Sequence, residues 1–139
     1  MSNELAVSAE YHGKMKYIAT NPAGKEVLMD YFKPLGDYEG FTPLELLLAS
    51  LAGCSGGAIG IFMRKFGMNE FKLKINVNGE RSTEHPTVFK TINIEFNFSG
   101  DGLDKEKIEK IVKMTEEKYC PVWAMLKNGV TISKTININ

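Results

Sequence analysis

The stretch TPLELLLASLAGCSGGAIGIFMRKFG, residues 42–67, decides how the rest of the chain must fold. It opens with a helix-start signal: Thr42 is a favourable N-cap, and Pro43 suits the first helical position. Glu45 stands three residues after the cap, where it can complete a capping box. Gly67 supplies a stop after a basic last turn, where positive charge suits the helix dipole. The pattern predicts one long helix.

The predicted helix has almost no polar face. Its large apolar side chains point in every direction, which is typical of a helix surrounded by other elements: Leu46, Leu47, Leu48, Leu51, Ile59, Ile61 and Phe62. Glycine inside a helix costs roughly 0.5–1 kcal/mol relative to alanine, so the glycines around Cys54 predict close approach of another element. The uncharged run of residues 46–63 is at the lower limit for a membrane span and contains several glycines. We therefore expect no membrane crossing.

Length and charge limit the class of protein. A chain of 139 residues is most simply one domain, residues 1–139. Lysine plus arginine and aspartate plus glutamate number 17 each, so no global field attracts nucleic acid. The N-terminus lacks the charged-then-apolar pattern of a signal peptide, so we expect a cytoplasmic protein. Neither of the two histidines lies near a CxxC motif, so we expect no zinc or haem site.

Alternating apolar and polar residues on both sides of the long helix predict strands, and a second, amphipathic helix follows. The expected elements are a hairpin over residues 4–20, a strand over 25–29, an irregular loop over 30–41, the long helix, strands over 71–77 and 92–98, helices over 103–119 and 121–127, and a strand over 130–138. The loop aromatics Tyr31, Tyr38 and Phe41 either rim a pocket or cover the helix end. This order, βββ-α-ββ-α-α-β, indicates an α+β fold of antiparallel sheets around a long buried central helix.

The two cysteines, Cys54 and Cys120, are the candidate chemical groups. Cys120 is expected at the N-cap of the short helix that begins at Pro121, and helix N-termini favour thiolates. Cys54 lies mid-helix among apolar residues, so it needs a positive group from elsewhere in the fold to become a nucleophile. The residues by themselves leave two interpretations open: a redox pair, or two buried structural cysteines.

Two segments resemble the OsmC/Ohr family, whose names stand for osmotically inducible protein C and organic hydroperoxide resistance. The block TPLELLLA at residues 42–49, continuing to Gly53-Cys54, is similar to the central helix of that family. The segment EEKYCPV at residues 116–122 is similar to its second cysteine segment. The order of strands and helices matches as well, so the resemblance covers nearly the whole chain.

The resemblance implies thiol-dependent reduction of organic hydroperoxides in an intertwined homodimer, with active sites at the subunit interface. By position, Cys54 resembles the peroxidatic cysteine and Cys120 the resolving cysteine. An external dithiol of the lipoyl type would restore both thiols, and no metal or bound cofactor is implied. Glu45 is nine residues before Cys54, on the opposite face of one helix. If both serve one site, Glu45 must come from the second subunit.

Two positions depart from the family pattern. The active peroxidases carry an arginine on the N-terminal strands, whereas this chain has no arginine before Arg64. Lysines are the available substitutes there: Lys14, Lys16, Lys25 and Lys33. The family's glutamate directly after the proline is Leu44 here, and the acid is Glu45. Two other functions therefore stay open beside the peroxidase: a dimer that binds an apolar or fatty-acyl ligand without turnover, and a stress protein whose thiols sense oxidants.

Overall fold

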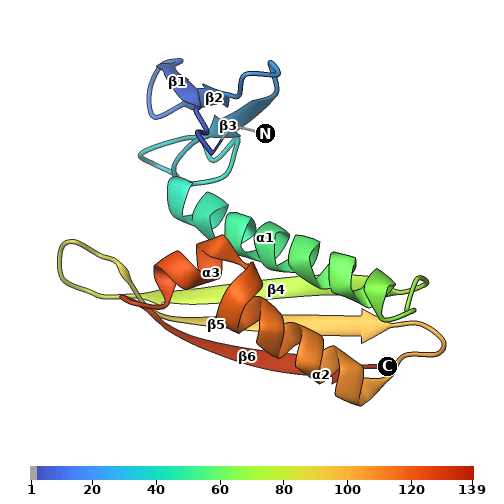
Figure 1. Ribbon diagram of the computed structural model, residues 1–139. Coiled ribbons are helices and arrows are strands. Elements are labelled where there is room, and N and C mark those ends of the chain that lie inside the picture. The colour runs from blue at the N-terminus through green and yellow to red at the C-terminus, as the bar shows by residue number, and fades with distance from the viewer. Residues whose placement is uncertain (1–2) are drawn as a thin grey trace. The chain divides into compact units, whose positions relative to one another are not determined.

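The computed structural model describes residues 3–139, and its internal contacts form two compact units, one up to Leu47 and one from Leu48 onward (Figure 1). The elements are β1 (Ser8–Tyr11), β2 (Tyr17–Thr20), β3 (Glu26–Met29), α1 (Pro43–Lys65), β4 (Lys72–Arg81), β5 (Phe89–Ser99), α2 (Lys105–Met114), a π-helical turn (Thr115–Tyr119), α3 (Pro121–Leu126) and β6 (Thr131–Ile138). The predicted α+β order of elements is confirmed.

The first unit is an antiparallel meander of β1, β2 and β3. The predicted first strand is shorter than its alternation suggested, because Leu5 and Val7 lie outside β1 and are 94% and 76% exposed. Within the described chain these apolar side chains pack against no other element, so their burial contributes nothing to extending the strand. The irregular segment 30–41 follows β3 as predicted, and the Asp30 N–H donates to the Phe41 carbonyl at 2.9 Å, so the two ends of this loop meet.

The start of α1 is the predicted capping box. The Glu45 N–H donates to Thr42 Oγ1 at 3.2 Å, and the Thr42 N–H donates to Glu45 Oε1 at 2.9 Å. Two N–H groups that a helix start leaves without a helical partner are thereby satisfied.

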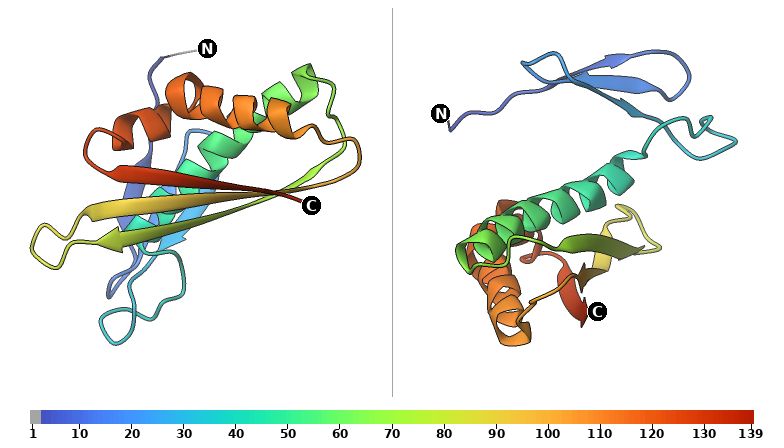
Figure 2. Two further views of the ribbon diagram at one scale, coloured as in Figure 1. Left: turned by 90° about the horizontal axis from the view of Figure 1, so that it is seen from below. Right: turned by 90° about the vertical axis from the view of Figure 1, so that its right-hand side faces the viewer.

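The second unit is a sheet with strand order β4-β5-β6, whose one face is covered by helices (Figure 2). Strands β4 and β5 pair antiparallel, as predicted, but β6 pairs parallel to β5, so this sheet is mixed rather than wholly antiparallel. The reason is the connection: α2 and α3 stand between β5 and β6, and a helical crossover returns the chain in the same direction.

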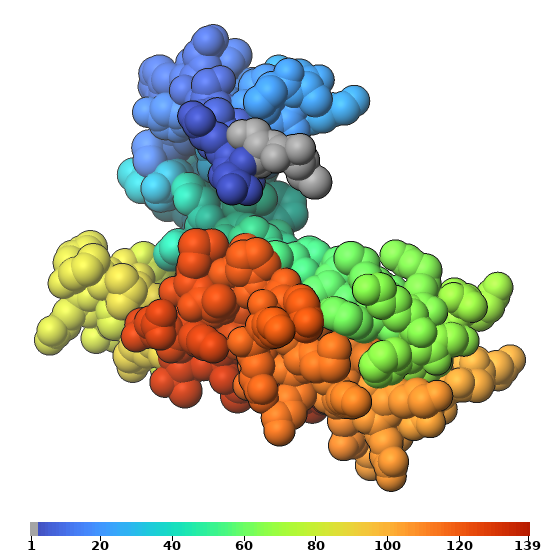
Figure 3. Space-filling model, in the orientation of Figure 1, coloured from blue at the N-terminus to red at the C-terminus, as the bar shows by residue number. Residues whose placement is uncertain are grey.

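The apolar core lies between this sheet and its helices. Alternate residues of β5 are at most 1% exposed: Ile92, Ile94, Phe96 and Phe98. From α3, the Trp123 ring stacks on Phe96 with the ring centres 6.4 Å apart. From α1, Phe62 contacts Tyr119 of the π-helical turn at 4.8 Å between ring centres. Figure 3 shows α2 and α3 (orange to red) side by side with the later turns of α1 (green).

Helix α1 is enclosed on one side rather than on all sides. Its buried residues form a single stripe with a spacing of four: Leu51, Ser55, Ile59 and Met63. Side chains built at Gly53 or Gly57 would meet no atom within 4 Å, whereas one at Gly56 would meet Ile75 at 3.1 Å. The predicted close approach therefore occurs at Gly56 and not at Gly53 or Gly57 within one chain. By length and composition α1 could cross a membrane, a test that core helices of soluble proteins also pass.

The predicted helix over 103–119 changes form before it ends. Helix α2 stops at Met114, and residues Thr115–Tyr119 form a π-helical turn. The Cys120 N–H donates to the Thr115 carbonyl at 3.0 Å, five residues back, instead of four. Pro121 follows and has no N–H to continue the helix. The turn thus sets the direction in which Cys120 enters α3.

Candidate functional site: two adjoining thiols

The second unit brings the two cysteines together. Cys54 comes from the middle of α1, and Cys120 is the N-cap of α3, as predicted. Their thiol groups interact through a hydrogen bond, and neither cysteine forms a disulfide. Cys54 is partly exposed, whereas Cys120 is 1% exposed. Two sulfurs 66 positions apart in sequence therefore share one site.

The first turn of α3 supplies N–H donors to both sulfurs. The Val122 N–H hydrogen-bonds to the Cys54 thiol, and the Trp123 N–H donates to Cys120 Sγ at 3.4 Å. These are the second and third residues of the helix, whose N–H groups have no acceptor within it. The N-cap prediction for Cys120 implied the Trp123 bond, but no local signal could reveal the bond from Val122 to a residue on another helix.

A third donor is Ser55, which the sequence reasoning did not identify. Its hydroxyl donates to Cys120 Sγ at 3.4 Å, and its side chain is fully buried in the stripe of α1 that faces the core. Ser55 directly follows Cys54 in the sequence, so a single turn of α1 contributes one of the two thiols and a hydrogen bond to the other.

Burial is the largest influence on the Cys54 thiol and raises its pKa above the ordinary value. The Val122 N–H acts in the opposite direction, while the neighbouring Cys120 raises the pKa further. None of these influences from the described residues is a cation. The raised pKa agrees with the expectation for a mid-helix cysteine among apolar residues.

Glu45, the third predicted site residue, belongs to the other unit, where both of its carboxylate oxygens have partners. Oε2 accepts from the Tyr38 hydroxyl at 2.6 Å, and Oε1 accepts from the Thr42 N–H. The Tyr38 hydrogen bond is the largest cause that lowers the pKa of Glu45, so this carboxylate is ionised at neutral pH. The same pair raises the pKa of Tyr38.

Two of the lysines considered as substitutes for the missing arginine are held by carboxylates. Lys14 Nζ and Lys16 Nζ both lie 2.6 Å from Asp37, and Lys16 also lies 3.1 Å from Glu39 and 3.9 Å from the buried Asp30. The three carboxylates are close enough together to suggest a metal site, but the Lys16 ammonium is bonded to them. Lys25 and Lys33 form no ion pair with any residue from 3 to 139.

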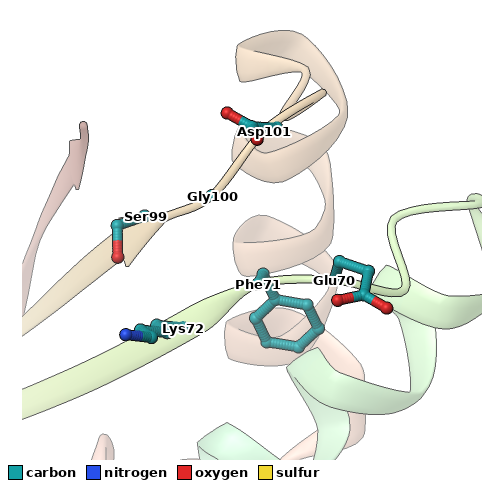
Figure 4. A pocket seen from close by; sticks show the side chains of 6 residues that line it. All are labelled: Glu70, Phe71, Lys72, Ser99, Gly100 and Asp101. Carbon is teal, nitrogen blue, oxygen red and sulfur yellow. The ribbon is translucent and has the colours of Figure 1, made fainter.

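Two surface hollows have no cysteine in their lining. One, of about 310 Å³, is lined by residues of the 30–41 loop and the start of α1: Tyr38, Glu39, Gly40, Phe41 and Glu45. The expectation that loop aromatics rim a pocket thus applies to Tyr38 and Phe41. The other, of about 430 Å³, lies where β4 begins and β5 ends, and Figure 4 shows its lining. No thiol lines either hollow.

Comparison with known proteins places the chain in a family. The family model described as OsmC-like protein matches residues 36–134, which include both cysteines and Glu45. The chain belongs to the OsmC-like family. This OsmC-like chain is 27% identical to Protein YhfA of Escherichia coli over 124 residues, which cover 89% of the chain and 90% of that protein.

Solved structures have the same fold. A hypothetical protein from Aquifex aeolicus is 26% identical, with a TM-score of 0.87 and coverage of 99% of this chain and 98% of that one. The organic hydroperoxide resistance protein OhrB of Bacillus subtilis is 21% identical, with a TM-score of 0.66 and coverage of 96% and 98%. At that identity the likeness to OhrB concerns the fold alone.

Proposed function

We propose that this OsmC-like chain is a thiol-dependent peroxidase that reduces organic hydroperoxides, with Cys54 as the peroxidatic and Cys120 as the resolving cysteine. The observation that carries the proposal is that the two thiols adjoin: Ser55, next to Cys54 in the sequence, donates to Cys120 Sγ at 3.4 Å, and the thiol of Cys120 acts directly on that of Cys54. Buried structural cysteines have no need to adjoin, whereas a two-cysteine cycle requires it. Further support comes from the family and from the fold shared with OhrB, whose name states organic hydroperoxide resistance.

The cycle uses the two sulfurs in turn. The Cys54 thiolate attacks one oxygen of the hydroperoxide, the O–O bond breaks, and the alkoxide leaves as an alcohol after it takes a proton. Cys54 is now a sulfenic acid, and Cys120 displaces its hydroxyl as water to form a disulfide. An external dithiol of the lipoyl type then reduces the disulfide and is itself oxidised to a cyclic disulfide. The cycle needs no metal and no bound cofactor.

The proposed enzyme is a cytoplasmic homodimer. Each subunit is a single OsmC-like domain of 139 residues. The support for a second subunit is the surface that one chain leaves open: the space beside Gly53 and Gly57 of α1, and the half-exposed Ile61 on the same helix. A second subunit would supply the missing cation, from Lys25 or Lys33, together with Glu45. A cation beside Cys54 would counteract the effect of burial on its pKa.

The second candidate is a dimer that binds an apolar ligand without turnover. Two observations favour it: burial raises the pKa of Cys54, and a hollow lies beside Tyr38 and Phe41. This candidate predicts that both thiols stay free in the presence of peroxide.

A peroxide-consumption assay distinguishes the two candidates. Cumene hydroperoxide and linoleic acid hydroperoxide are offered with dihydrolipoamide, and the peroxidase predicts that Cys54→Ser abolishes turnover. Ser133→Ala, on the exposed side of β6, is the control and keeps wild-type turnover. Mass spectrometry after one equivalent of peroxide should record the loss of two hydrogens as the disulfide forms. Equal behaviour of wild type and Cys54→Ser would end the peroxidase proposal, and persistent free thiols would favour the binding protein.

A further inference from the structure

The two sulfurs of the site have unequal surroundings. Cys120 Sγ accepts hydrogen bonds from the Ser55 hydroxyl and the Trp123 N–H, each at 3.4 Å, and it is almost completely buried. Cys54 receives one backbone N–H, from Val122, and is partly exposed. Within one chain, therefore, two donors point at the Cys120 sulfur, whereas the Cys54 sulfur is the more accessible of the two.

We propose that Ser55 is a positioning residue that makes Cys120 the leaving sulfur when the Cys54–Cys120 disulfide is reduced, so that the external thiol attacks Cys54. The proposal rests on the disulfide cycle given above, and it adds a direction to it. Thiol–disulfide exchange is faster when the leaving sulfur is better stabilised as a thiolate, and it depends on which sulfur the reagent can reach. In this site the hydrogen-bond donors favour Cys120 as the leaving sulfur, and accessibility favours Cys54 as the attacked sulfur.

The exchange balances in two steps. The thiolate of the reductant forms a bond to Cys54 Sγ, the protein S–S bond breaks, and its electron pair goes to Cys120 Sγ. The Ser55 hydroxyl and the Trp123 N–H then donate to the new Cys120 thiolate, which later takes a proton from solvent. With a dithiol, the second sulfur of the reductant attacks the mixed disulfide, so that Cys54 leaves as a thiolate and the reductant closes to a cyclic disulfide.

The direction of the Ser55 hydroxyl is the feature that suggests a role beyond packing. Serine inside a helix commonly donates to the carbonyl four residues earlier in its own helix. In this chain the hydroxyl donates instead to a sulfur on a segment 65 residues away. A hydrogen bond to a charged group contributes more than one between neutral groups, so this bond strengthens when Cys120 becomes a thiolate.

The test starts from the full-length protein oxidised to its internal disulfide with diamide, a reagent that acts without peroxide. A monothiol, 2-mercaptoethanol, is added at one equivalent because it cannot close a ring, so the mixed disulfide can be trapped by an early quench. After acid quenching, free thiols are labelled with N-ethylmaleimide. The adduct is located by mass spectrometry, because Cys54 and Cys120 fall on different tryptic peptides, residues 26–64 and 119–127. The three proteins compared are wild type, Ser55→Ala and Ser55→Thr.

The expected result is a mixed disulfide mainly on Cys54 in the wild type. Ser55→Ala should reduce about tenfold more slowly, with a larger share of adduct on Cys120, because one donor to the leaving thiolate is lost. Ser55→Thr keeps the hydroxyl and should restore both the rate and the distribution. If Ser55 had only a structural role, both variants would change thermal stability, and Ser55→Ala would not differ from Ser55→Thr in reduction rate or adduct position.

Two results would overturn the inference: adduct mainly on Cys120 in the wild type, or Ser55→Ala behaving as wild type. Failure of the proposed function has a different signature. If the disulfide forms and exchanges as described but hydroperoxide is not consumed, the peroxidase is refuted while the direction of exchange stands. If diamide produces no internal disulfide, both are refuted.

Discussion

The two units of the chain bury opposite kinds of side chain. In the unit from Leu48 onward, apolar residues of α1, β5, α2 and α3 form the core, and every buried hydrophobic residue of the described chain lies there. In the unit before it, the fully buried side chain is Asp30, which accepts hydrogen bonds from the Tyr31 and Glu39 N–H groups at 2.8 and 3.0 Å.

This contrast shows what each unit needs in order to be stable. Apolar burial is the main source of folding free energy, and the buried apolar side chains belong to the second unit. The first unit relies on strand pairing, the capping box and ion pairs around Lys16, while many of its large apolar side chains stay exposed: Leu5, Val7, Tyr11, Tyr17, Val27, Tyr31, Phe32, Leu35, Tyr38 and Phe41. A surface of this kind favours a protein partner, as the proposed dimer would provide.

The largest effect expected from this contrast concerns two phenylalanines. Phe96→Ala, in the core of the second unit, should lower the free energy of unfolding by about 3–5 kcal/mol, because it leaves a cavity under Trp123. Phe32→Ala, at a side chain that is 54% exposed, should cost less than about 1 kcal/mol in dilute protein. Urea denaturation followed by circular dichroism measures both. Similar losses of unfolding free energy in Phe96→Ala and Phe32→Ala would contradict the proposed difference between the two units.

A charge on the open face of α1 should disrupt self-association. Ile61→Glu is expected to weaken the dimer roughly a hundredfold, because an unpaired carboxylate would be buried in the interface at a cost of several kcal/mol. Val88→Glu is the matched control, since Val88 is exposed to a similar degree near the turn between β4 and β5. Sedimentation analysis of both variants measures the effect. A wild type that sediments as a monomer at every concentration would refute the dimer.

The ion pairs of Asp37 with Lys14 and Lys16 should break at acidic pH, when the Asp37 carboxylate is protonated. The hydrogen bonds from Lys14 and then Lys16 lower the pKa of Asp37 from 3.8 to about 2. A group whose pKa is lowered by folding stabilises the folded state above its unfolded pKa, and this contribution is lost as the pH falls through the folded value. We therefore expect the 30–41 loop to loosen between about pH 4 and pH 2.

Hydrogen exchange of the Tyr38 N–H, which donates to the Tyr31 carbonyl at 2.9 Å, reports on this loop. Asp37→Asn should remove the pH step and leave the exchange fast throughout. Asp101→Asn, at an acidic residue of the other unit with no ion pair among residues 3–139, is the control. A pH step that survives in Asp37→Asn would assign the transition to another group.

The smallest effect concerns the carboxylate of Glu45. Tyr38→Phe removes the hydroxyl that donates to Oε2, so the pKa of Glu45 should rise toward its ordinary value while the global stability changes little. Carbon-13 NMR titration of the side chain measures the pKa. Tyr31→Phe, on the same loop, should leave it unchanged. An unaltered Glu45 pKa in Tyr38→Phe would mean that the Thr42 N–H alone sets it.

Features that depend on neighbours in sequence were predictable. The capping box of Thr42 and Glu45, the N-cap position of Cys120 and the break at Pro121 each involve residues within four positions of one another. The alternation of β5 also identified its buried residues, because a strand places successive side chains on opposite faces. The two cysteine segments were sufficient to indicate the family.

Features that depend on distant contacts were decided only by the tertiary structure. The parallel pairing of β6, the one-sided burial of α1 and the bond from Lys16 to carboxylates more than twenty residues away have no local signal. The same holds for the donor that Ser55 offers to Cys120. The sequence by itself determined most of the helices and strands and indicated the two cysteine segments, since local backbone preferences act over a few residues. The meeting of the sulfurs and their unequal surroundings arise only when the core packs, because packing alone fixes which remote groups come within hydrogen-bonding distance.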